Sequence, residues 1–341
     1  MENIYNYSLD KLENVLVTAN FKKYNASQIY DWLYKKRVTS FNDMTNLKKE
    51  LINYLNNNFN IDSLKILKVE EETDVKKFLF ELKDESKIEA VLMYQDYGIS
   101  LCISTQVGCN MACAFCESGR LKKVRNLETY EMVSQILLVE SYIDKKITHL
   151  VLMGIGEPFD NYDNVITFID IINNNKGIEL GSRHITISTC GIIPKIEEFM
   201  NLGKQVNLAV SLHAPNNEIR DQIMAINKVY NIESLIKTIK KYIKVTNRRV
   251  TFEYIMLKNI NDREENAIEL SKLLKAINCY VNLIPYNETS HINLTKSDKN
   301  TILKFYDILK KNKINVTIRK EFGSSVSAAC GQLRSNYEEE Q

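Results

Sequence analysis

Three cysteines stand close together at the spacing Cys-x3-Cys-x2-Cys, and no fourth ligand follows in the local sequence; they are Cys109, Cys113 and Cys116. A structural zinc site normally closes its tetrahedron with four protein ligands, and most iron–sulfur clusters likewise take four thiolates. Three thiolates on one short loop leave one metal position open, where a substrate or cofactor can bind. The motif therefore predicts a metal centre that takes part in chemistry.

At this spacing the run resembles the cluster loop of the radical S-adenosylmethionine (SAM) enzymes. In that family three cysteines hold a 4Fe–4S cluster, and SAM chelates the fourth iron through its amino and carboxylate groups. The resemblance implies that Cys109, Cys113 and Cys116 are the cluster ligands. The alternative is a zinc knuckle that borrows a distant ligand such as His149 or Cys102, since spacing is the main discriminator between cysteine motifs.

The elements that must position this loop follow it as a regular alternation of short β-rich runs and amphipathic helices. Such alternation is typical of a parallel sheet with right-handed crossovers. The predicted strands are 101–105, 148–153, 184–189, 206–212, 250–255 and 280–284, and the predicted helices are 128–143, 234–242, 264–274 and 298–310. We therefore expect an α/β fold, a partial (β/α)6 TIM-like barrel, with its site at the carboxyl ends of the strands.

In the part of the chain before the predicted barrel, the spacing of apolar residues changes from helical to alternating. Ile29, Trp32 and Leu33 share one helical face, whereas 77–82 and 88–93 alternate with period two around a turn and predict a β-hairpin. The predicted organisation is then a small helical N-terminal domain, a connecting β-hairpin, the barrel and a short tail. Their boundaries are 1–70, 71–97, 98–334 and 335–341.

Small and polar residues follow four of the predicted strands, where a cofactor would lie in a barrel. The glycine pair of the segment 154–158 lets the backbone approach a ligand closely, and Glu157 can accept from an ammonium or a hydroxyl. Each such segment alone is typical of a loop whose polar groups are hydrogen-bonded within the loop. Four of them at the ends of strands that follow the cysteine loop indicate one site. The four segments are 154–158, 187–191, 211–215 and 283–287.

Taken together, these motifs resemble the RlmN/Cfr family of radical SAM RNA methyltransferases. The stretch 32–47 also resembles that family's accessory domain, which implies that residues 1–70 bind RNA. The Ala-Ala-Cys-Gly-Gln-Leu run around Cys330 is the most family-specific piece, and the match covers nearly the whole chain. The segments that carry it are 154–161, 211–216, 282–287 and 328–333.

The family mechanism implies a role for the remaining cysteines. One SAM methylates the thiol of Cys330, and a second SAM is cleaved reductively to a 5′-deoxyadenosyl radical, which takes a hydrogen from that methyl group. The resulting carbon radical adds to the adenine ring and tethers the protein to RNA. Release needs Glu89 as the proton acceptor and Cys102 as the resolving thiol, which forms a transient disulfide with Cys330. A covalent intermediate of this kind needs one sulfur to form it and another to break it.

Cofactor contacts carry over at matching positions, and they imply a 4Fe–4S cluster with two SAM per turnover and an electron donor such as flavodoxin or ferredoxin. Without the family, His213 reads as a strand-end histidine bonded to backbone and Glu89 as an outward-facing strand residue. Cys190 and Cys279 match no catalytic position and read as buried small hydrophobes. The implied contacts are Gly156, Glu157, Ser188, Ser211, Leu212, His213 and Asn287.

The leading functional hypothesis is methylation of C2 of an adenosine in 23S rRNA near the peptidyl transferase centre, with the tRNA anticodon loop as a further candidate substrate. The second is Cfr-like methylation of C8 of the same rRNA adenosine, which confers antibiotic resistance. Pro158 and Pro285 favour the first, Phe322 before Gly323 favours the second, and Ser327 favours neither. A non-catalytic zinc-stabilised RNA-binding protein and a thiol redox sensor are the alternatives from other classes.

Composition limits the setting. The 341 residues are 44% hydrophobic and 26% charged, which is ordinary for a folded globular protein. The net charge of +2 does not by itself indicate RNA, although basic residues follow the cluster loop from Arg120 to Arg125 and could hold phosphates. Seven unevenly clustered cysteines fit a reducing compartment, and no apolar run approaches the ~20 residues of a membrane span. We therefore expect a cytoplasmic monomer with no membrane partner.

Overall fold

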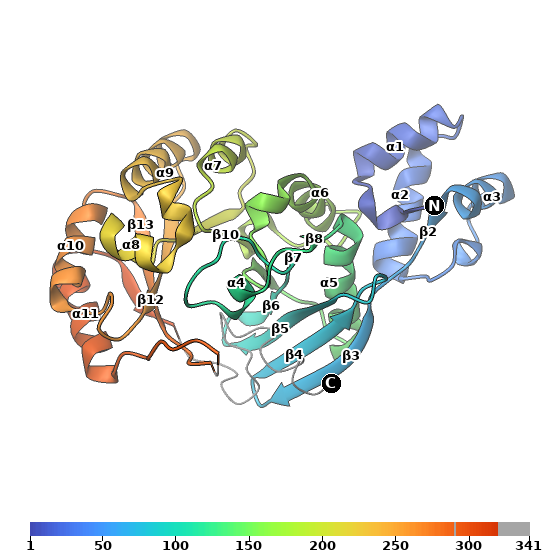
Figure 1. Ribbon diagram of the computed structural model, residues 1–341. Coiled ribbons are helices and arrows are strands. Elements are labelled where there is room, and N and C mark those ends of the chain that lie inside the picture. The colour runs from blue at the N-terminus through green and yellow to red at the C-terminus, as the bar shows by residue number, and fades with distance from the viewer. Residues whose placement is uncertain (290, 320–341) are drawn as a thin grey trace.

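A curved sheet forms the centre of the protein, whose computed structural model describes residues 1–289 and 291–319 (Figure 1). Over these residues the sheet has ten strands in the order β14-β13-β12-β11-β10-β9-β6-β5-β4-β3. From β6 to β14 neighbouring strands are parallel and follow the chain order, which is the winding of a β/α barrel. These strands are β6 (Gly98–Cys102), β9 (His149–Leu152), β10 (Ile185–Thr189), β11 (Asn207–Ser211), β12 (Val250–Met256), β13 (Cys279–Pro285) and β14 (Val316–Ile318).

Helices connect the parallel strands and cover the outer face of the sheet (Figure 1). Helix α9 shows why they form: Asn231 caps its first turn, and Ile232, Leu235 and Ile239 line one buried face at helical spacing. The connecting helices are α5 (Thr129–Ile143), α6 (Tyr162–Asn173), α7 (Ile193–Met200), α8 (Asn217–Ile223), α9 (Ile232–Thr246), α10 (Glu264–Leu274) and α11 (Lys299–Lys311). This arrangement confirms the predicted α/β class and partial barrel.

An antiparallel extension continues the sheet beyond β6. Strands β4 (Val75–Glu81) and β5 (Lys87–Gln95) form the predicted hairpin, and β5 pairs antiparallel with β6. The sequence did not predict β3 (Lys65–Glu72), which pairs with β4 at the edge of the sheet. Its side chains are half-buried or exposed and largely charged, so no clean alternation of apolar residues marks it.

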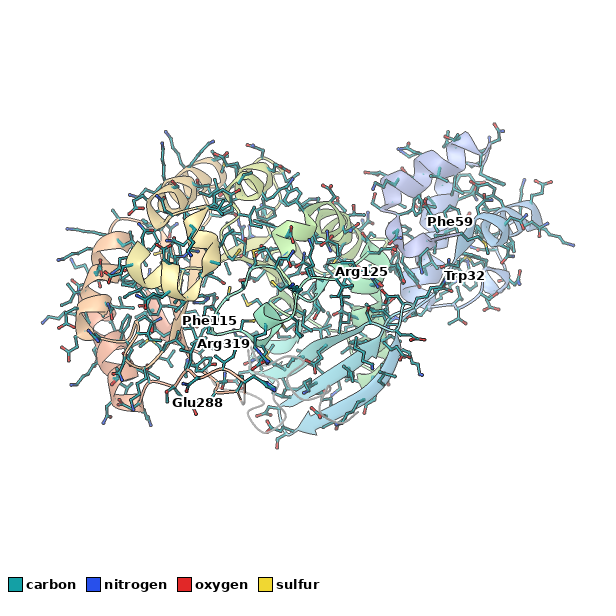
Figure 2. The ribbon with its side chains drawn as sticks, in the orientation of Figure 1. Trp32, Phe59, Phe115, Arg125, Glu288 and Arg319 are labelled. Atoms are coloured by element: carbon teal, nitrogen blue, oxygen red, sulfur yellow. The ribbon has the colours of Figure 1, made fainter. Side chains whose placement is uncertain are left out.

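The N-terminal part is a helical unit that packs against the barrel at α5 and α6. It contains α1 (Leu9–Thr18), α2 (Tyr24–Tyr30), a π-helical turn (Asp31–Lys36) and α3 (Lys49–Asn58). The side chain of Asn6 joins it to α5, since Nδ2 donates to Glu128 Oε2 at 2.8 Å and Oδ1 accepts from the Tyr130 amide at 2.8 Å. Arg37 forms an ion pair with the buried carboxylate of Glu140 on α5. Trp32 and Phe59 mark this unit in Figure 2.

The described residues include no helix that is both long and apolar enough to span a bilayer.

Candidate active site

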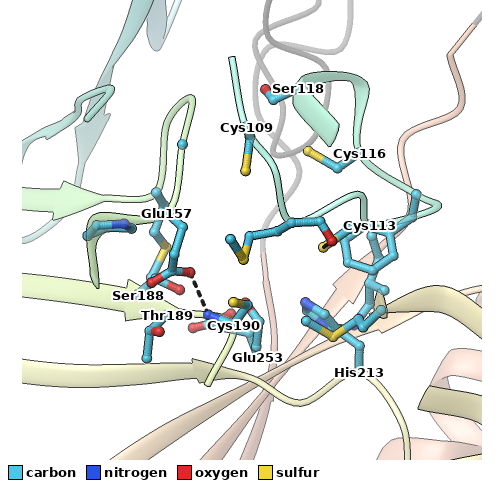
Figure 3. Close-up of a pocket in the computed structure, with 18 of the residues that line it drawn as sticks. Cys109, Cys113, Cys116, Ser118, Glu157, Ser188, Thr189, Cys190, His213 and Glu253 are labelled. Atoms are coloured by element: carbon cyan, nitrogen blue, oxygen red, sulfur yellow. Dashed lines mark hydrogen bonds between the residues drawn. The ribbon is translucent and has the colours of Figure 1, made fainter. Parts of the chain in front are cut away.

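The cysteine loop and the carboxyl ends of the parallel strands enclose a cavity of about 150 Å³ (Figure 3). Eight of the residues predicted for the metal or the cofactor line it: Cys109, Cys113, Cys116, Gly156, Glu157, Ser188, Ser211 and His213. They come from the loop after β6 and from the ends of β9, β10 and β11. The structure therefore brings together at one place residues as far apart in the chain as Cys109 and His213.

Four predicted residues lie elsewhere. Leu212 is fully buried in the hydrophobic core, and Asn287 is half-buried beyond the end of β13; neither lines the cavity. Glu89 and Cys102 lie on the neighbouring strands β5 and β6. Cys330 lies outside the described residues.

Backbone hydrogen bonds hold the cysteine loop in place. The Cys109 amide donates to the carbonyl of Leu121 at 3.0 Å, and the Ala114 amide donates to the carbonyl of Ile223 at 3.0 Å. Gly108 precedes the loop with a φ of +72°, and a side chain there would meet the Lys122 carbonyl oxygen at 2.2 Å. The loop is therefore fixed both to its own return strand and to α8.

The three thiols fit a 4Fe–4S cluster. Burial, with a smaller contribution from neighbouring anions, raises the pKa of Cys109 to about 12 and that of Cys113 well above its ordinary value. Iron would stabilise the thiolates that metal binding requires. No three ligand side chains in the described ranges meet at a single-ion site. A cluster has no need of one, because each cysteine binds a different iron.

Neither of the distant ligands considered for a zinc site lies at the cavity. His149 begins β9, at the opposite end of that strand from the cavity, and its Nε2 lies 3.0 Å from Nδ1 of His184. Cys102 packs in an apolar cluster with Val91 and Met93. Neither residue lines the cavity.

Glu157 is held rigidly at the floor of the cavity (Figure 3). Its Oε2 accepts from the Cys190 amide at 2.7 Å and its Oε1 from the Phe159 amide at 3.0 Å. Burial raises the pKa of this carboxyl, while those amide donors oppose the rise. A carboxylate oxygen has more than one lone pair, so Glu157 can still accept from an ammonium group.

Gly156 allows the turn after β9 to pack tightly against Gln106. Its φ is +107°, and an added side chain would meet Cβ of Gln106 at 2.6 Å. Gln106 in turn accepts from the Glu157 amide at 2.9 Å and donates to Asp160 at 2.9 Å. Glycine is therefore required by both conformation and space.

His213 is bonded to backbone and also forms part of the cavity wall. Its Nδ1 accepts from the Ile255 amide at 3.0 Å, which is the strand-end role that we expected without the family. Burial, with a contribution from Arg220, lowers its pKa to about 3, so the ring is neutral. Its ring packs edge-on against Phe115 with centroids 4.8 Å apart.

Three buried polar residues at the site were not predicted. Arg220 is fully buried beneath the strand ends, and Asn261 donates to the carbonyls of His213 and Ile255, both at 2.7 Å. Glu253 on β12 lines the cavity, accepts from Asn282 at 2.8 Å, and has a pKa raised by burial. No local sequence pattern identifies these three residues. The segments around Arg220 and Asn261 have the composition of a polar loop or an exposed helix surface, and Glu253 is a single polar residue within a strand.

Glu89 does not face outward, contrary to the expectation made without the family. It is 4% exposed, on the same inner face of the sheet as Val91 and Cys102. Lys77 on β4 places its Nζ 3.5 Å from Glu89 Oε1 and 2.7 Å from Glu70 Oε2. Three charged side chains on adjacent strands thus form a row from the edge of the sheet to its interior.

Of the other cysteines outside the loop, Cys279 is buried in the core as predicted, whereas Cys190 is buried but faces the cavity.

Several basic residues after the cluster loop are already paired. Arg120 bonds Glu117 and Lys123 bonds Asp160, each at 2.7 Å. Arg125 bonds Asp84 on the hairpin turn and Glu131 on α5. These contacts show structural roles for residues that the charge pattern had suggested for phosphates.

Comparison with known proteins gives matches along the whole chain. The family described as "Radical SAM superfamily" matches residues 103–271, and the "Ribosomal RNA large subunit methyltransferase N-terminal domain" matches residues 2–61. A Spiroplasma citri protein described as "Probable dual-specificity RNA methyltransferase RlmN" is 52% identical over 342 residues, which cover 99% of each chain. An Enterococcus faecalis protein with that description is 53% identical and covers 98% of this chain and 96% of its own.

A solved structure is also similar over the whole chain. The crystal structure of a radical SAM methyltransferase from Sphaerobacter thermophilus has a TM-score of 0.92 at 36% identity. The match covers 98% of this chain and 100% of that one.

Proposed function

The chain belongs to the RlmN family of radical SAM RNA methyltransferases, and from this premise we propose that it methylates C2 of an adenosine in 23S rRNA near the peptidyl transferase centre. An adenosine in the tRNA anticodon loop is the proposed second substrate, in keeping with the dual specificity in the relatives' names. The observation that carries the proposal is the cavity, in which a three-thiol loop faces the carboxylate of Glu157 and the strand-end polar residues.

The cofactors are a 4Fe–4S cluster and SAM, and the cavity offers groups suited to both. Cys109, Cys113 and Cys116 would hold the cluster. Glu157 would receive the amino group of SAM, and Gly156, Ser188, Ser211 and His213 would contact the rest of that molecule. When bound, cluster and SAM supply a 5′-deoxyadenosyl radical by reductive cleavage.

The covalent steps are assigned to three residues of the chain. Cys330 carries the methyl group, a role that rests on the family resemblance. Glu89 takes the proton from the adenine ring, and Lys77 Nζ lies 3.5 Å from its Oε1. Cys102 resolves the adduct, and it shares the inner face of the sheet with Glu89. Leu212 and Asn287 remain proposed cofactor contacts.

The setting is proposed as the cytoplasm, with flavodoxin or ferredoxin as the electron donor and a monomeric enzyme. Residues 1–70 are proposed to bind RNA, since the matching family model is a methyltransferase N-terminal domain. The adenine must leave its stack to reach the cavity, which favours a loop or a flipped base.

Mass spectrometry of nucleosides tests the proposal. The reconstituted enzyme is incubated anaerobically with an rRNA fragment, a reductant and SAM, and the RNA is then digested. We expect 2-methyladenosine. Production of 8-methyladenosine would instead support the Cfr-like activity. If neither methyladenosine appears although the cluster is intact, the substrate assignment is overturned.

A further inference from the structure

Arg220 on α8 is a buried cation whose hydrogen bonds all go to neutral groups. It is 0% exposed. Its five N–H donors are matched by five acceptors, of which four are backbone carbonyls and one is the Asn227 side chain. The acceptors are Leu212 O at 3.1 Å, Asn227 Oδ1 at 3.0 Å, Tyr230 O at 3.3 Å, Cys190 O at 2.7 Å and Ser211 O at 3.2 Å.

No carboxylate forms an ion pair with Arg220 within residues 1–289 and 291–319. Asp221 is the acid whose charge acts on it, but Asp221 Oδ1 accepts from Asn227 Nδ2 at 2.7 Å rather than from the guanidinium. A buried arginine is usually paired with an acid. The positive charge of Arg220 is therefore satisfied by hydrogen bonds without being cancelled by a contacting anion.

The helix that carries Arg220 is bonded to the cysteine loop. The carbonyl of Ile223, one turn after Arg220, accepts from the amide of Ala114, which lies between Cys113 and Cys116. Arg220 Nη2 bonds Cys190, which lines the same cavity as the three thiols. Phe115, Ile223 and Met224 form a buried apolar cluster on one side of this space, and Glu157, which accepts from the Cys190 amide at 2.7 Å, is an acidic group on the other. A charge in such surroundings is only weakly screened.

We propose that Arg220 raises the reduction potential of the cluster bound by Cys109, Cys113 and Cys116. Reduction adds an electron to the cluster, so a fixed cation beside the loop stabilises the reduced state relative to the oxidised one. Radical SAM chemistry begins with this electron. The inference rests on the family's cofactor and is independent of which RNA is the substrate.

The test is a redox titration of the reconstituted holoenzyme, followed by electron paramagnetic resonance, with iron and sulfide content measured for each variant. For Arg220→Met we expect a more negative midpoint, with the one-electron reduction at least tenfold less favourable, or about 59 mV. Arg220→Lys keeps the charge but loses most of the hydrogen bonds, so its midpoint should stay near that of the wild type. Arg183→Met, at the opposite end of β10, removes one charge away from the loop and should leave the midpoint unchanged.

Equal midpoints for wild type and a fully loaded Arg220→Met protein would overturn the proposal. Equal shifts in Arg220→Met and Arg220→Lys would also overturn it, because a shift caused only by lost hydrogen bonds should appear in both.

A second variant covers the case in which Arg220→Met does not fold or loses its cluster. The double exchange Asn227→Asp with Asp221→Asn leaves the net charge unchanged and moves the carboxylate into contact with Arg220 Nη1. The hydrogen bond between positions 221 and 227 can re-form with donor and acceptor reversed, whereas the 3.1 Å bond from position 227 to Asn217 Oδ1 is lost and Asn217 keeps its bond from the Ile232 amide. We expect a more negative midpoint in this variant too, and a wild-type midpoint with full iron content would refute the proposal.

Discussion

The two sulfurs assigned to the covalent steps should fail in different ways. With Cys102→Ala the adduct forms but cannot be resolved, so we expect a protein–RNA species with a shifted band on a denaturing gel. Cys330→Ala, its matched control, cannot carry the methyl group and should give neither adduct nor product. Absence of the band for Cys102→Ala under turnover conditions would remove Cys102 from the resolving role.

Removal of the negative charge of Glu157 should weaken SAM binding without affecting cluster assembly. Glu157→Gln keeps the shape, loses the negative charge that an ammonium would contact, and also loses one of the two acceptors for the Cys190 and Phe159 amides. A charge-assisted hydrogen bond of this kind contributes about 1.5–3 kcal/mol, so the SAM dissociation constant should rise roughly tenfold to a hundredfold. Equilibrium dialysis with labelled SAM measures this, while iron content should match the wild type. An unchanged dissociation constant would remove Glu157 from the SAM site.

The neutral His213 should make the apoprotein acid-sensitive. Its pKa of about 3 lies below the value of about 6.5 of an unfolded histidine, so the unfolded chain binds the extra proton between these limits. The free energy of unfolding should therefore fall as pH drops, with about 2 kcal/mol lost from this group between pH 6.5 and pH 5.

Urea denaturation across that pH range measures the effect as a difference from His213→Asn. Asparagine tolerates the φ of +58° and offers an amide oxygen to Ile255, but it does not titrate. Glu157 and Glu253, whose pKa values are raised by burial, act in the opposite direction in both proteins and cancel in the comparison. Parallel pH profiles for the two proteins would contradict the prediction.

At the scale of elements, the turn after β9 should tolerate no side chain. In Gly156→Ala the new methyl group meets Gln106, whose other contacts hold Glu157 and Asp160. We expect a folded protein whose SAM affinity falls by roughly tenfold or more, as for loss of a charge-assisted contact. Gly203→Ala is the matched control, since that glycine also has a positive φ of +66° but nothing within 4 Å. Equal SAM affinity in the two variants would show that the turn is not critical.

The elements that could be predicted are those with strong local patterns. Apolar runs at the barrel strands and the period-two hairpin identified β9 to β13, β4 and β5, because a buried strand must be apolar wherever it packs. Strand β6 lies a few residues earlier than predicted, since the Ser104 amide leaves the sheet to bond Gln135. Strand β3 carries charges at a sheet edge, and β14 is only three residues long, so neither has a local signal.

The site was predictable where a motif carries chemistry in its spacing. The three loop cysteines and Glu157 are of this kind, and they line one cavity. Arg220 and Asn261 could not be found this way. Their role comes from bonds to carbonyls at the ends of other strands, and which strand ends meet is decided by the fold rather than by neighbours in sequence.

For the protein as a whole, a change in how the helical unit docks onto the barrel should alter RNA binding more than SAM binding. Glu140 is 1% exposed and binds Arg37 of the helical unit, and it also accepts from the Ile147 amide at 2.9 Å. Glu140→Gln should loosen the docking by about 1 kcal/mol and raise the KM for RNA about fivefold. SAM affinity should not change.

Glu197→Gln is the matched control, because it breaks the ion pair of Glu197 on α7 with Lys241 on α9, both in the barrel. It should leave the KM for RNA unchanged. A wild-type KM in Glu140→Gln would show that the orientation of the helical unit does not depend on this contact.

The row of Glu70, Lys77 and Glu89 also bears on where a proton goes after the chemistry. On the proposal that Glu89 takes the ring proton, this buried carboxyl must lose the proton again before the next turnover, with bulk water as the final acceptor. Lys77 bridges Glu89 to Glu70, whose side chain is 28% exposed at the sheet edge. The row would then connect the proposed base to solvent through the wall of the barrel.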